Sequence, residues 1–419
     1  MDIKDKIQAA NYKAVNHIID AEPYWIDVRR ADEVLENFDE KTILHSGPPI
    51  AYENMCMLHK RGMINGVLLE GWADNEANAE KLILSGEIKI DSAMNYNTVG
   101  SGTGIITRSV PLIVCRDKKT GTVAGVFPAE GEFGGGFCGW GVYSKEIAQN
   151  LAYMRDTLFS GIREILKDIG GIPLKPIIAN GLKMGDENHS SQTAVDLLFL
   201  KEIIPHALKC ANSSELIMYF VNTNRFFHNY GQSFSRCSIL SAEGIEYSTM
   251  VTAAGGNGVE YGIKIAGLGD RWFTAPSPMI HGKYMTQGSK PEDQLPWIGD
   301  SSIVECVGLG GIVSAASPIV CSWRGDKLSD AINTTRKMKK ITISQNSNYE
   351  IPTLDFENPP VGIDVLKVAR SGILPVIDGG MINKNGGWMG AGCAEIPLDC
   401  FTKAKKEFEK KYCCKHHNI

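Results

Sequence analysis

The amino-acid sequence predicts a multi-domain, mixed α/β protein with a helical middle region. Short apolar segments alternate with helical patterns near both ends of the chain, whereas helical spacing dominates between residues 144 and 246. The length of 419 residues also exceeds what a single hydrophobic core usually supports. We therefore expect an N-terminal α/β domain over residues 1–143, a helical domain over residues 144–246 and a C-terminal α/β domain over residues 247–419.

The N-terminal region begins with a predicted helix. Apolar residues recur at helical spacing from Ile3 to Ile18, and Pro23 marks the end of this pattern. Residues 41–45 and 66–70 are short apolar segments that predict strands, and a helical pattern follows each of them. This alternation predicts a mainly parallel sheet.

Glycine-rich and hairpin patterns follow. Apolar runs at residues 110–115 and 122–127 flank a polar turn at residues 117–121, which predicts a hairpin. The stretch 131–141 is very rich in glycine. The basic segment 403–415 has aromatic residues between its lysines and predicts an exposed terminal helix. Strands are also expected in the C-terminal region at residues 249–253, 259–265, 303–307, 340–344 and 374–377.

The composition of the chain argues against several classes of protein. The net charge is −5, so no basic face for nucleic acid is indicated. Residues 1–20 do not resemble a signal peptide, and no run of about 18 apolar residues occurs, so we expect a cytoplasmic protein without a membrane segment. The eleven cysteines lack the spacing of zinc ligands, and no Walker A or G-x-G-x-x-G motif is present. We expect no metal and no cofactor.

The first candidate site is the turn that contains His45, Ser46 and Gly47. It follows a predicted strand and precedes a predicted helix, a position at which α/β proteins often bind ligands. The alternative is that the two prolines after Gly47 merely stiffen the turn and that His45 is satisfied inside the protein. The sequence favours neither interpretation.

The second candidate site is the acidic loop at residues 185–190. Asp186 or Asn188 could cap the helix that follows, but a cap explains one residue and not the whole cluster. Glu187 and His189 are two positions apart, so they could face one pocket. We therefore predict a functional role for this loop, whereas metal binding has little support because no second histidine lies at helical spacing.

The third candidate site is the loop at residues 267–272. Its glycines, Gly269 among them, permit close approach of the backbone to a ligand, and Arg271 offers a planar fork for carboxylate or phosphate. The alternative is a turn stabilised by a local ion pair between Asp270 and Arg271. We favour the functional interpretation.

Further acidic residues follow in the C-terminal region. Asp300 lies in a glycine-containing loop, and Asp378 falls at the end of an apolar strand, so both are candidate ligand-binding residues. Glu305 stands three residues after Ser302, the spacing of a helix capping box, which we take as its role. The glycines at residues 308–311 indicate either close packing or a backbone anion site.

Seven short strings along the chain together resemble one known family. They are LHSGPPI at residues 44–50, EGWA at 70–73, MGDENH at 184–189, NRFF at 224–227, GLGDRWF at 267–273, IGDS at 298–301 and GIDV at 362–365. They span nearly the whole chain in order, and the family they resemble is the one that includes YlbE and YahG and is often encoded beside FdrA. One branch of it, called AllG, resembles the large subunit of an oxamate carbamoyltransferase.

The resemblance implies an enzyme of allantoin and purine nitrogen catabolism. It implies a carbamoyltransferase that interconverts oxalurate plus phosphate and oxamate plus carbamoyl phosphate. The implied partners are these small anions, an FdrA-like subunit and a third small subunit. We expect the isolated chain to form a homo-oligomer.

That reaction requires pockets for anions, a donor for the carbonyl oxygen and an acid for the leaving nitrogen. Arg271 with neighbouring glycine N–H groups is the expected anion site. Glu187 or His189 is expected to transfer the proton, and Asp270 is expected to orient either group.

Two other functions stay open on the sequence. The chain could be a non-catalytic scaffold or regulatory subunit that binds an FdrA-like partner. It could also be a hydrolase or metal-dependent enzyme that acts on a related small amide, and a divalent ion near Asp186 and Glu187 would favour that function.

Overall fold

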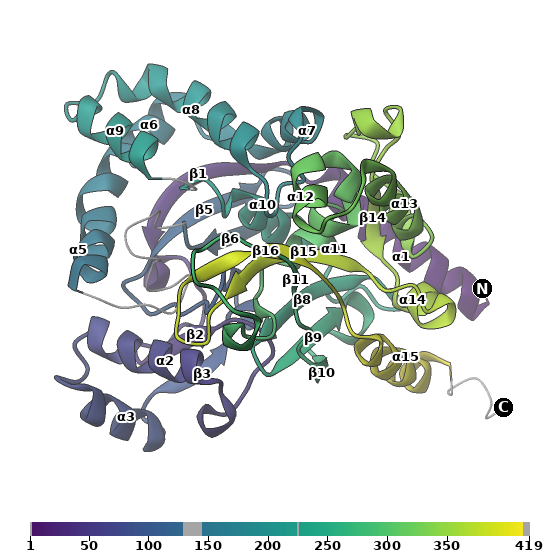
Figure 1. The fold of residues 1–419 in the computed structure, drawn as a ribbon, viewed down its shortest axis with the longest axis horizontal. Coiled ribbons are helices and arrows are strands. Elements are labelled where there is room, and N and C mark those ends of the chain that lie inside the picture. The colour runs from purple at the N-terminus through teal and green to yellow at the C-terminus, as the bar shows by residue number, and fades with distance from the viewer. Residues whose placement is uncertain (1, 129–144, 224–225, 414–419) are drawn as a thin grey trace.

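A computed structural model describes residues 2–128, 145–223 and 226–413 and confirms the mixed α/β class (Figure 1). The glycine-rich stretch 131–141 lies outside these residues. The helices are α1 (Ile3–Asp20), α2 (Met57–Leu69), α3 (Glu76–Leu84), α5 (Lys145–Tyr153), α6 (Phe159–Ile169), α7 (Leu174–Met184), α8 (Thr193–Ala207), α9 (Ser213–Asn222), α10 (Tyr230–Ile239), α11 (Ile303–Cys306), α12 (Pro318–Trp323), α13 (Leu328–Met338), α14 (Val365–Ser371) and α15 (Leu398–Tyr412). The strands are β1 (Pro23–Arg30), β2 (Thr42–His45), β3 (Lys89–Ser92), β4 (Thr98–Val99), β5 (Pro111–Asp117), β6 (Val123–Val126), β7 (Ile172–Pro173), β8 (Val251–Asn257), β9 (Glu260–Ile265), β10 (Phe273–Pro276), β11 (His281–Tyr284), β12 (Ile298–Gly299), β13 (Thr342–Gln345), β14 (Pro360–Ile363), β15 (Val376–Ile382) and β16 (Trp388–Glu395).

The strands form several small sheets. The largest has the order β4-β6-β5-β1-β7, and two others have the orders β10-β9-β8-β12 and β11-β16-β15. Among the described strand pairs, only β2 with β3 and β4 with β6 are parallel. The expectation of a mainly parallel sheet was therefore wrong. Tight connections such as those between β5 and β6 and between β8 and β9 impose antiparallel pairing, and they confirm the predicted hairpin at residues 110–127.

Two predicted strands are helical in the structure. Residues 66–69 form the end of α2 and Glu70 is its C-cap. Gly66 lies against Ile43 and Thr107 so closely that a Cβ would be 3.1 Å from each side chain. Residues 303–307 contain the short helix α11. Short apolar runs do not distinguish a strand from a buried helix, which explains both errors.

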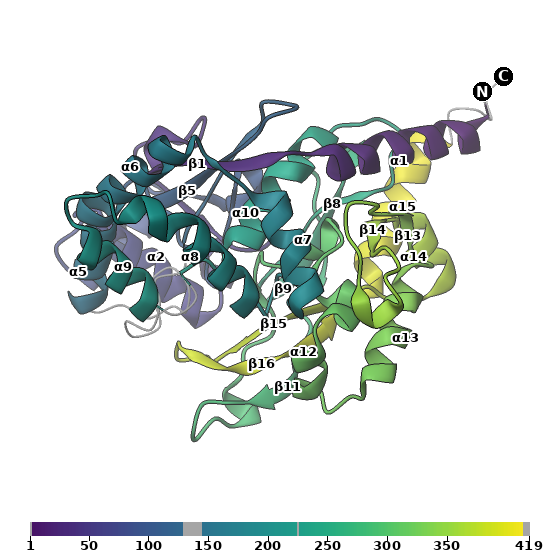
Figure 2. The ribbon, with the colours of Figure 1, turned by 90° about the horizontal axis from the view of Figure 1, so that it is seen from above.

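The helical region packs on the five-stranded sheet through aromatic side chains. Trp25 of β1 meets Tyr230 of α10 at a ring-centroid distance of 4.7 Å, and Phe199 of α8 stacks on Phe227 at 4.9 Å. Figure 2 shows α5, α6, α8 and α9 at one end of the molecule and α13, α14 and α15 at the other. The middle of the molecule, where α7, α10 and β15 lie, joins these two ends.

The terminal helix α15 is not the exposed helix that the sequence predicted. Its aromatic face is buried, and the hydroxyl of Tyr412 donates to the carbonyl oxygen of Gly267 at 2.7 Å. Tyr412 also packs against Tyr247, over which the ammonium group of Lys6 of α1 lies. Tyr247 therefore lies between the first and last helices, which are at the same end of the molecule (Figure 1).

One contiguous set of buried apolar residues extends from α1 to α15. The division into three domains stays a prediction. Within the described residues, no helix has the length and apolar character that a membrane span requires.

Candidate functional site

Three distant segments bring a histidine and two carboxylates together in the middle of the molecule. His189 lies in the loop between α7 and α8, Glu305 lies in α11 and Asp378 is the third residue of β15. The Nδ1 atom of His189 is 2.9 Å from Oε1 of Glu305 and 3.2 Å from Oδ1 of Asp378. All three side chains are buried. We call these residues, together with Glu187, the His189 cluster.

Glu187 organises the loop that carries His189. Its Oε1 atom accepts the backbone N–H groups of His189, Ser190 and Ser191, while its own carbonyl oxygen accepts the N–H of Gly310 at 2.8 Å. Its other carboxylate oxygen, Oε2, is buried and has no hydrogen-bond partner. Glu187 thus holds the turn with one oxygen and leaves the second one free.

Glu305 does not form the capping box that the sequence predicted. Ser302 makes no side-chain cap to α11, and its hydroxyl instead donates to the carbonyl oxygen of Ala254 at 2.8 Å. The Glu305 carboxylate turns toward His189, and its Oε1 accepts N–H groups from Gly311 at 2.9 Å and Asp378 at 3.2 Å. This residue is the functional candidate that the sequence analysis missed.

The glycines at residues 308–311 make room for this carboxylate. A Cβ on Gly310, which has φ +62°, would lie 2.3 Å from Oε1 of Glu305. A Cβ on Gly311 would lie 2.9 Å from the backbone nitrogen of Asp378. The glycines pack closely, which is one of the two interpretations of this segment. The other was a backbone anion site, and here the N–H of Gly311 contacts the carboxylate of Glu305.

Burial and mutual contact shift the pKa values of the cluster. Burial raises the pKa of Glu305 to about 7, against the opposing effect of His189. Burial and the charge of Asp378 raise the pKa of Glu187. Burial alone would lower the pKa of His189, but Glu305 and Asp378 together raise it. Burial alone would raise the pKa of Asp378, but His189 holds that pKa below its usual value. The cluster can therefore hold exchangeable protons or a cation.

The other two predicted residues of this loop have local roles. The carboxylate of Asp186 accepts the N–H of Val195 at 3.0 Å in the first turn of α8 and the hydroxyl of Ser191 at 2.8 Å. Asn188 adopts a left-handed backbone conformation with φ +67°. Its carbonyl oxygen lies so close to Gly231 that a Cβ there would be 2.4 Å away. Asp186 and Asn188 shape the loop, whereas Glu187 and His189 are members of the His189 cluster.

The first candidate turn and Asp300 contact each other. The N–H of Gly47 donates to Asp300 at 2.7 Å, and the second carboxylate oxygen of Asp300 accepts the N–H of Gly100. The hydroxyl of Ser46 lies 3.2 Å from Nε2 of His59, and Nδ1 of His45 lies 2.8 Å from the carbonyl oxygen of Ser46. Burial lowers the pKa of His45 and raises that of Asp300 to about 7. This contact joins the N-terminal and C-terminal regions.

The third candidate loop lies at the surface. Asp270 is almost fully exposed, and its carboxylate is 3.7 Å from the ammonium group of Lys264. Arg271 is also exposed and pairs with Glu407 of α15, and Gly269 has no neighbour within 4 Å of where a Cβ would be. The structure therefore brings Glu187, His189 and Asp378 together. The loop at residues 267–272 lies apart from them, at the surface.

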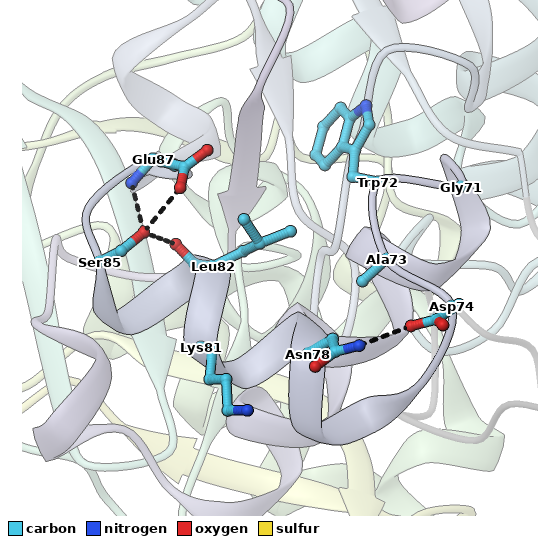
Figure 3. A pocket seen from close by; sticks show the side chains of 9 residues that line it. All are labelled: Gly71, Trp72, Ala73, Asp74, Asn78, Lys81, Leu82, Ser85 and Glu87. Carbon is cyan, nitrogen blue, oxygen red and sulfur yellow. Dashed lines mark hydrogen bonds between the residues drawn. The ribbon is translucent and has the colours of Figure 1, made fainter.

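A surface hollow of about 650 Å³ lies beside Trp72, between the end of α2 and α3 (Figure 3). Its polar side chains satisfy one another locally, since Asn78 donates to Asp74 at 2.7 Å and Ser85 to the carbonyl oxygen of Leu82 at 2.9 Å. None of the residues that line it is buried. The hollow is shallow, and its polar side chains are exposed to solvent.

The similarity to known proteins extends over nearly the whole chain. The family described as oxamate carbamoyltransferase subunit AllG matches residues 88–301. The uncharacterised protein YahG of Escherichia coli is 35% identical over 408 residues, 96% of this chain and 86% of that protein. Oxamate carbamoyltransferase subunit AllG of the same organism is 31% identical over 407 residues, 95% of this chain and 96% of that protein. A crystal structure of a conserved protein of unknown function from Enterococcus faecalis has a TM-score of 0.93 at 31% identity and covers 98% of this chain and 99% of its own.

Proposed function

Because the chain belongs to the family of oxamate carbamoyltransferase subunit AllG, we propose that it is the large subunit of a carbamoyltransferase. Its substrates are oxalurate and phosphate in one direction and oxamate and carbamoyl phosphate in the other, in allantoin catabolism. It works with an FdrA-like subunit and a third small subunit. The observation that carries the proposal is that the likeness to AllG extends over nearly the whole of both chains.

The proposed reaction exchanges a C–N bond for a C–O bond and moves one proton from phosphate to nitrogen. An oxygen atom of hydrogen phosphate attacks the carbamoyl carbon of oxalurate, and the bond from that carbon to the nitrogen that also bears the oxalyl group breaks. The electron pair of the broken bond stays on nitrogen, which takes the proton that the phosphate brings, and oxamate leaves. The enzyme must therefore hold two anions together and stabilise the charge that develops on the carbonyl oxygen.

We place the reacting groups beside the His189 cluster rather than beside Arg271. The cluster gathers polar groups from three segments in a buried setting, in which electrostatic effects are larger than at the surface. Arg271, in contrast, is exposed. Ser190 and Gly380, which lie one residue after His189 and two residues after Asp378, are partly exposed.

The test is phosphate-dependent formation of carbamoyl phosphate from oxalurate. The chain is assayed alone and after mixing with its FdrA-like and small partners. We expect activity only in the mixture. Substitution of His189 by Ala in the assembled complex should reduce kcat by about 100-fold or more, the scale on which loss of a polar group at a reacting centre acts.

The matched control is His206→Ala, because His206 is a surface histidine that also pairs with an aspartate, Asp168. This variant should retain full activity. Partners that bind the chain without any turnover of oxalurate would refute the proposed reaction. Full activity of a folded His189→Ala complex would refute the proposed location.

A further inference from the structure

The His189 cluster contains more carboxyl groups than its single imidazole can pair with. Glu187, Glu305 and Asp378 are each fully buried. Among the described residues, the ion pairs of Glu305 and Asp378 involve only His189, so a single imidazole faces three carboxylates. Burying carboxylates is costly unless they are paired, hydrogen-bonded, protonated or bound to a cation.

The spacing of these atoms fits a shared metal ion. Ligand atoms about 2.1 Å from one ion lie about 3.0–3.4 Å from each other when the geometry is octahedral or tetrahedral. Nδ1 of His189 is 2.9 Å from Oε1 of Glu305 and 3.2 Å from Oδ1 of Asp378. One ligand atom from each of the three residues lies within 4.8 Å of the other two.

Glu187 provides a second, separate observation. Its Oε2 atom is fully buried and has no hydrogen-bond partner, although its Oε1 atom accepts three backbone N–H groups. The backbone N–H of His189 donates to this carboxylate at 3.2 Å, so the carboxylate lies beside the cluster. A buried carboxylate oxygen without a donor needs a cation or a proton.

We propose that His189, Glu305 and Asp378 bind one divalent transition-metal ion, with Glu187 as an additional carboxylate beside them. Oxygen ligands with a single imidazole suit Mn²⁺ or Zn²⁺ better than Ca²⁺, which takes oxygen ligands alone. The site requires the glycines at 310 and 311, because a side chain there would meet Glu305 or the backbone of Asp378. No metal was expected from the sequence, because no second histidine lies at helical spacing from His189. Glu305 and Asp378 lie 116 and 189 residues after His189 in the chain, so no local motif contains all three residues.

A metal ion here has a consequence for substrate binding, and this part of the inference rests on the proposed function. Phosphate and the oxamate carboxylate are anions. Ionised carboxylates of the cluster would repel both when no cation is bound. A bound divalent ion reverses the local charge and can polarise a carbonyl or phosphoryl oxygen. The same ion would therefore make an acidic site suitable for anionic substrates.

Metal binding is tested on the full chain without partners or substrate. The chain is treated with a chelator, dialysed against micromolar Mn²⁺ or Zn²⁺, and its bound metal is measured by inductively coupled plasma mass spectrometry. We expect one ion per chain. In crystals soaked with Zn²⁺, an anomalous difference peak should lie about 2.0–2.2 Å from the ligand atoms of His189, Glu305 and Asp378. Absence of bound metal from the wild-type chain, or a peak elsewhere, overturns the proposal.

Substitutions distinguish the proposed metal ligands from other buried carboxylates by their effect on metal affinity. Glu305→Gln and Asp378→Asn should weaken metal binding by more than the about 10–100-fold typical of outer-shell partners. The control Asp364→Asn changes another buried aspartate, which caps α14 and lies outside the cluster, and it should bind the ion like the wild type. Unchanged affinity in folded Glu305→Gln overturns the proposal. If the ligand variants do not fold, the anomalous peak in the wild type decides.

The two proposals can fail separately. Absence of bound metal from the chain, together with carbamoyl phosphate formation by the assembled complex, would overturn the metal site and leave the proposed function standing. One bound ion per chain in a protein complex that does not turn over oxalurate would support the metal site and overturn the proposed reaction.

Discussion

The loops at residues 185–190 and 267–272 share one pattern: an aspartate directly follows a glycine, and a basic side chain follows within three residues of that aspartate. In the structure, the first loop is buried between α11 and β15, and its histidine contacts two carboxylates from elsewhere in the chain. The second loop lies at the surface, where Arg271 pairs with Glu407. The two loops differ in the distant residues that surround them. The sequence of a loop alone therefore does not indicate whether its side chains are buried beside charged partners.

The largest expected effect comes from removing the only imidazole of the buried loop. His189→Ala leaves Glu305 and Asp378 without the partner that compensates their charge. Loss of one member of a buried ion pair typically costs about 3–5 kcal/mol. We expect a reduction of this size in the free energy of unfolding, measured by urea denaturation in the presence of a chelator.

His206→Ala is the matched surface change, because it removes a histidine from a partly exposed pair with Asp168. It should leave the denaturation midpoint nearly unchanged. Equal effects of the two substitutions would show that burial does not distinguish the two histidines, and the comparison between buried and exposed loops would lose its basis.

The next effect tests whether the glycines of residues 308–311 serve the cluster. Gly310 and Gly185 both have positive φ, so alanine at either position costs about 1–2 kcal/mol in the backbone. Only Gly310→Ala also places a Cβ 2.3 Å from Glu305, whereas Gly185 has no neighbour within 4 Å. We expect Gly310→Ala to lose about 1–3 kcal/mol more than Gly185→Ala, as overpacking does. Equal losses in urea denaturation would contradict the close contact with Glu305.

A third prediction concerns the contact between Asp300 and the turn at Gly47. Aspartate in an unfolded chain titrates near pH 3.9, and burial raises the pKa of Asp300 to about 7 in the folded chain. The folded state therefore binds more protons between about pH 4 and pH 7, and the stability that this group contributes falls as the pH rises through that window. The slope is at most about 1.4 kcal/mol per pH unit.

Asp300→Asn removes this titration and keeps the shape of the side chain. The free energy of unfolding of the wild type relative to this variant should decrease between about pH 5 and pH 7. Asp39→Asn, at an exposed aspartate, serves as the control. A difference from Asp300→Asn that does not vary with pH would mean that Asp300 is already ionised throughout, and that the contact does not depend on its protonation.

Part of this architecture was predictable from the sequence. Periodicity indicated α1, and the polar turn indicated the hairpin of β5 and β6, because both signals are local. The clustering of polar residues at 185–190 also pointed to Glu187 and His189. The catalytic roles expected of these two residues remain proposals, and the structure adds their burial and their partners.

The remainder depended on contacts between distant segments. Glu305 had the spacing of a capping residue, and only the fold shows that its carboxylate reaches the loop 116 residues earlier. His45, Ser46, Gly47 and Asp300 were separate candidates for ligand binding, and the structure shows that Gly47 and Asp300 bind each other. The local sign of the site around Glu305 was the glycine-rich segment after it, since closely spaced glycines permit a carboxylate to approach the backbone.

The smallest expected effect is that of Arg271→Ala in the exposed loop. Arg271 has more than half of its side chain exposed, pairs with Glu407 and lies 5.4 Å from the ring of Phe273. Surface substitutions of this kind usually change free energies by no more than about 0.5 kcal/mol. The assembled complex should therefore keep kcat/KM for oxalurate within about twofold, because about 1.4 kcal/mol corresponds to a tenfold change. Glu407→Ala, which removes only the partner of Arg271, is the control. A tenfold or greater loss in Arg271→Ala that this control does not reproduce would instead restore the loop at residues 267–272 as the anion site that its sequence predicts, and the assembled complex would then have to bury a loop that is exposed in the isolated chain.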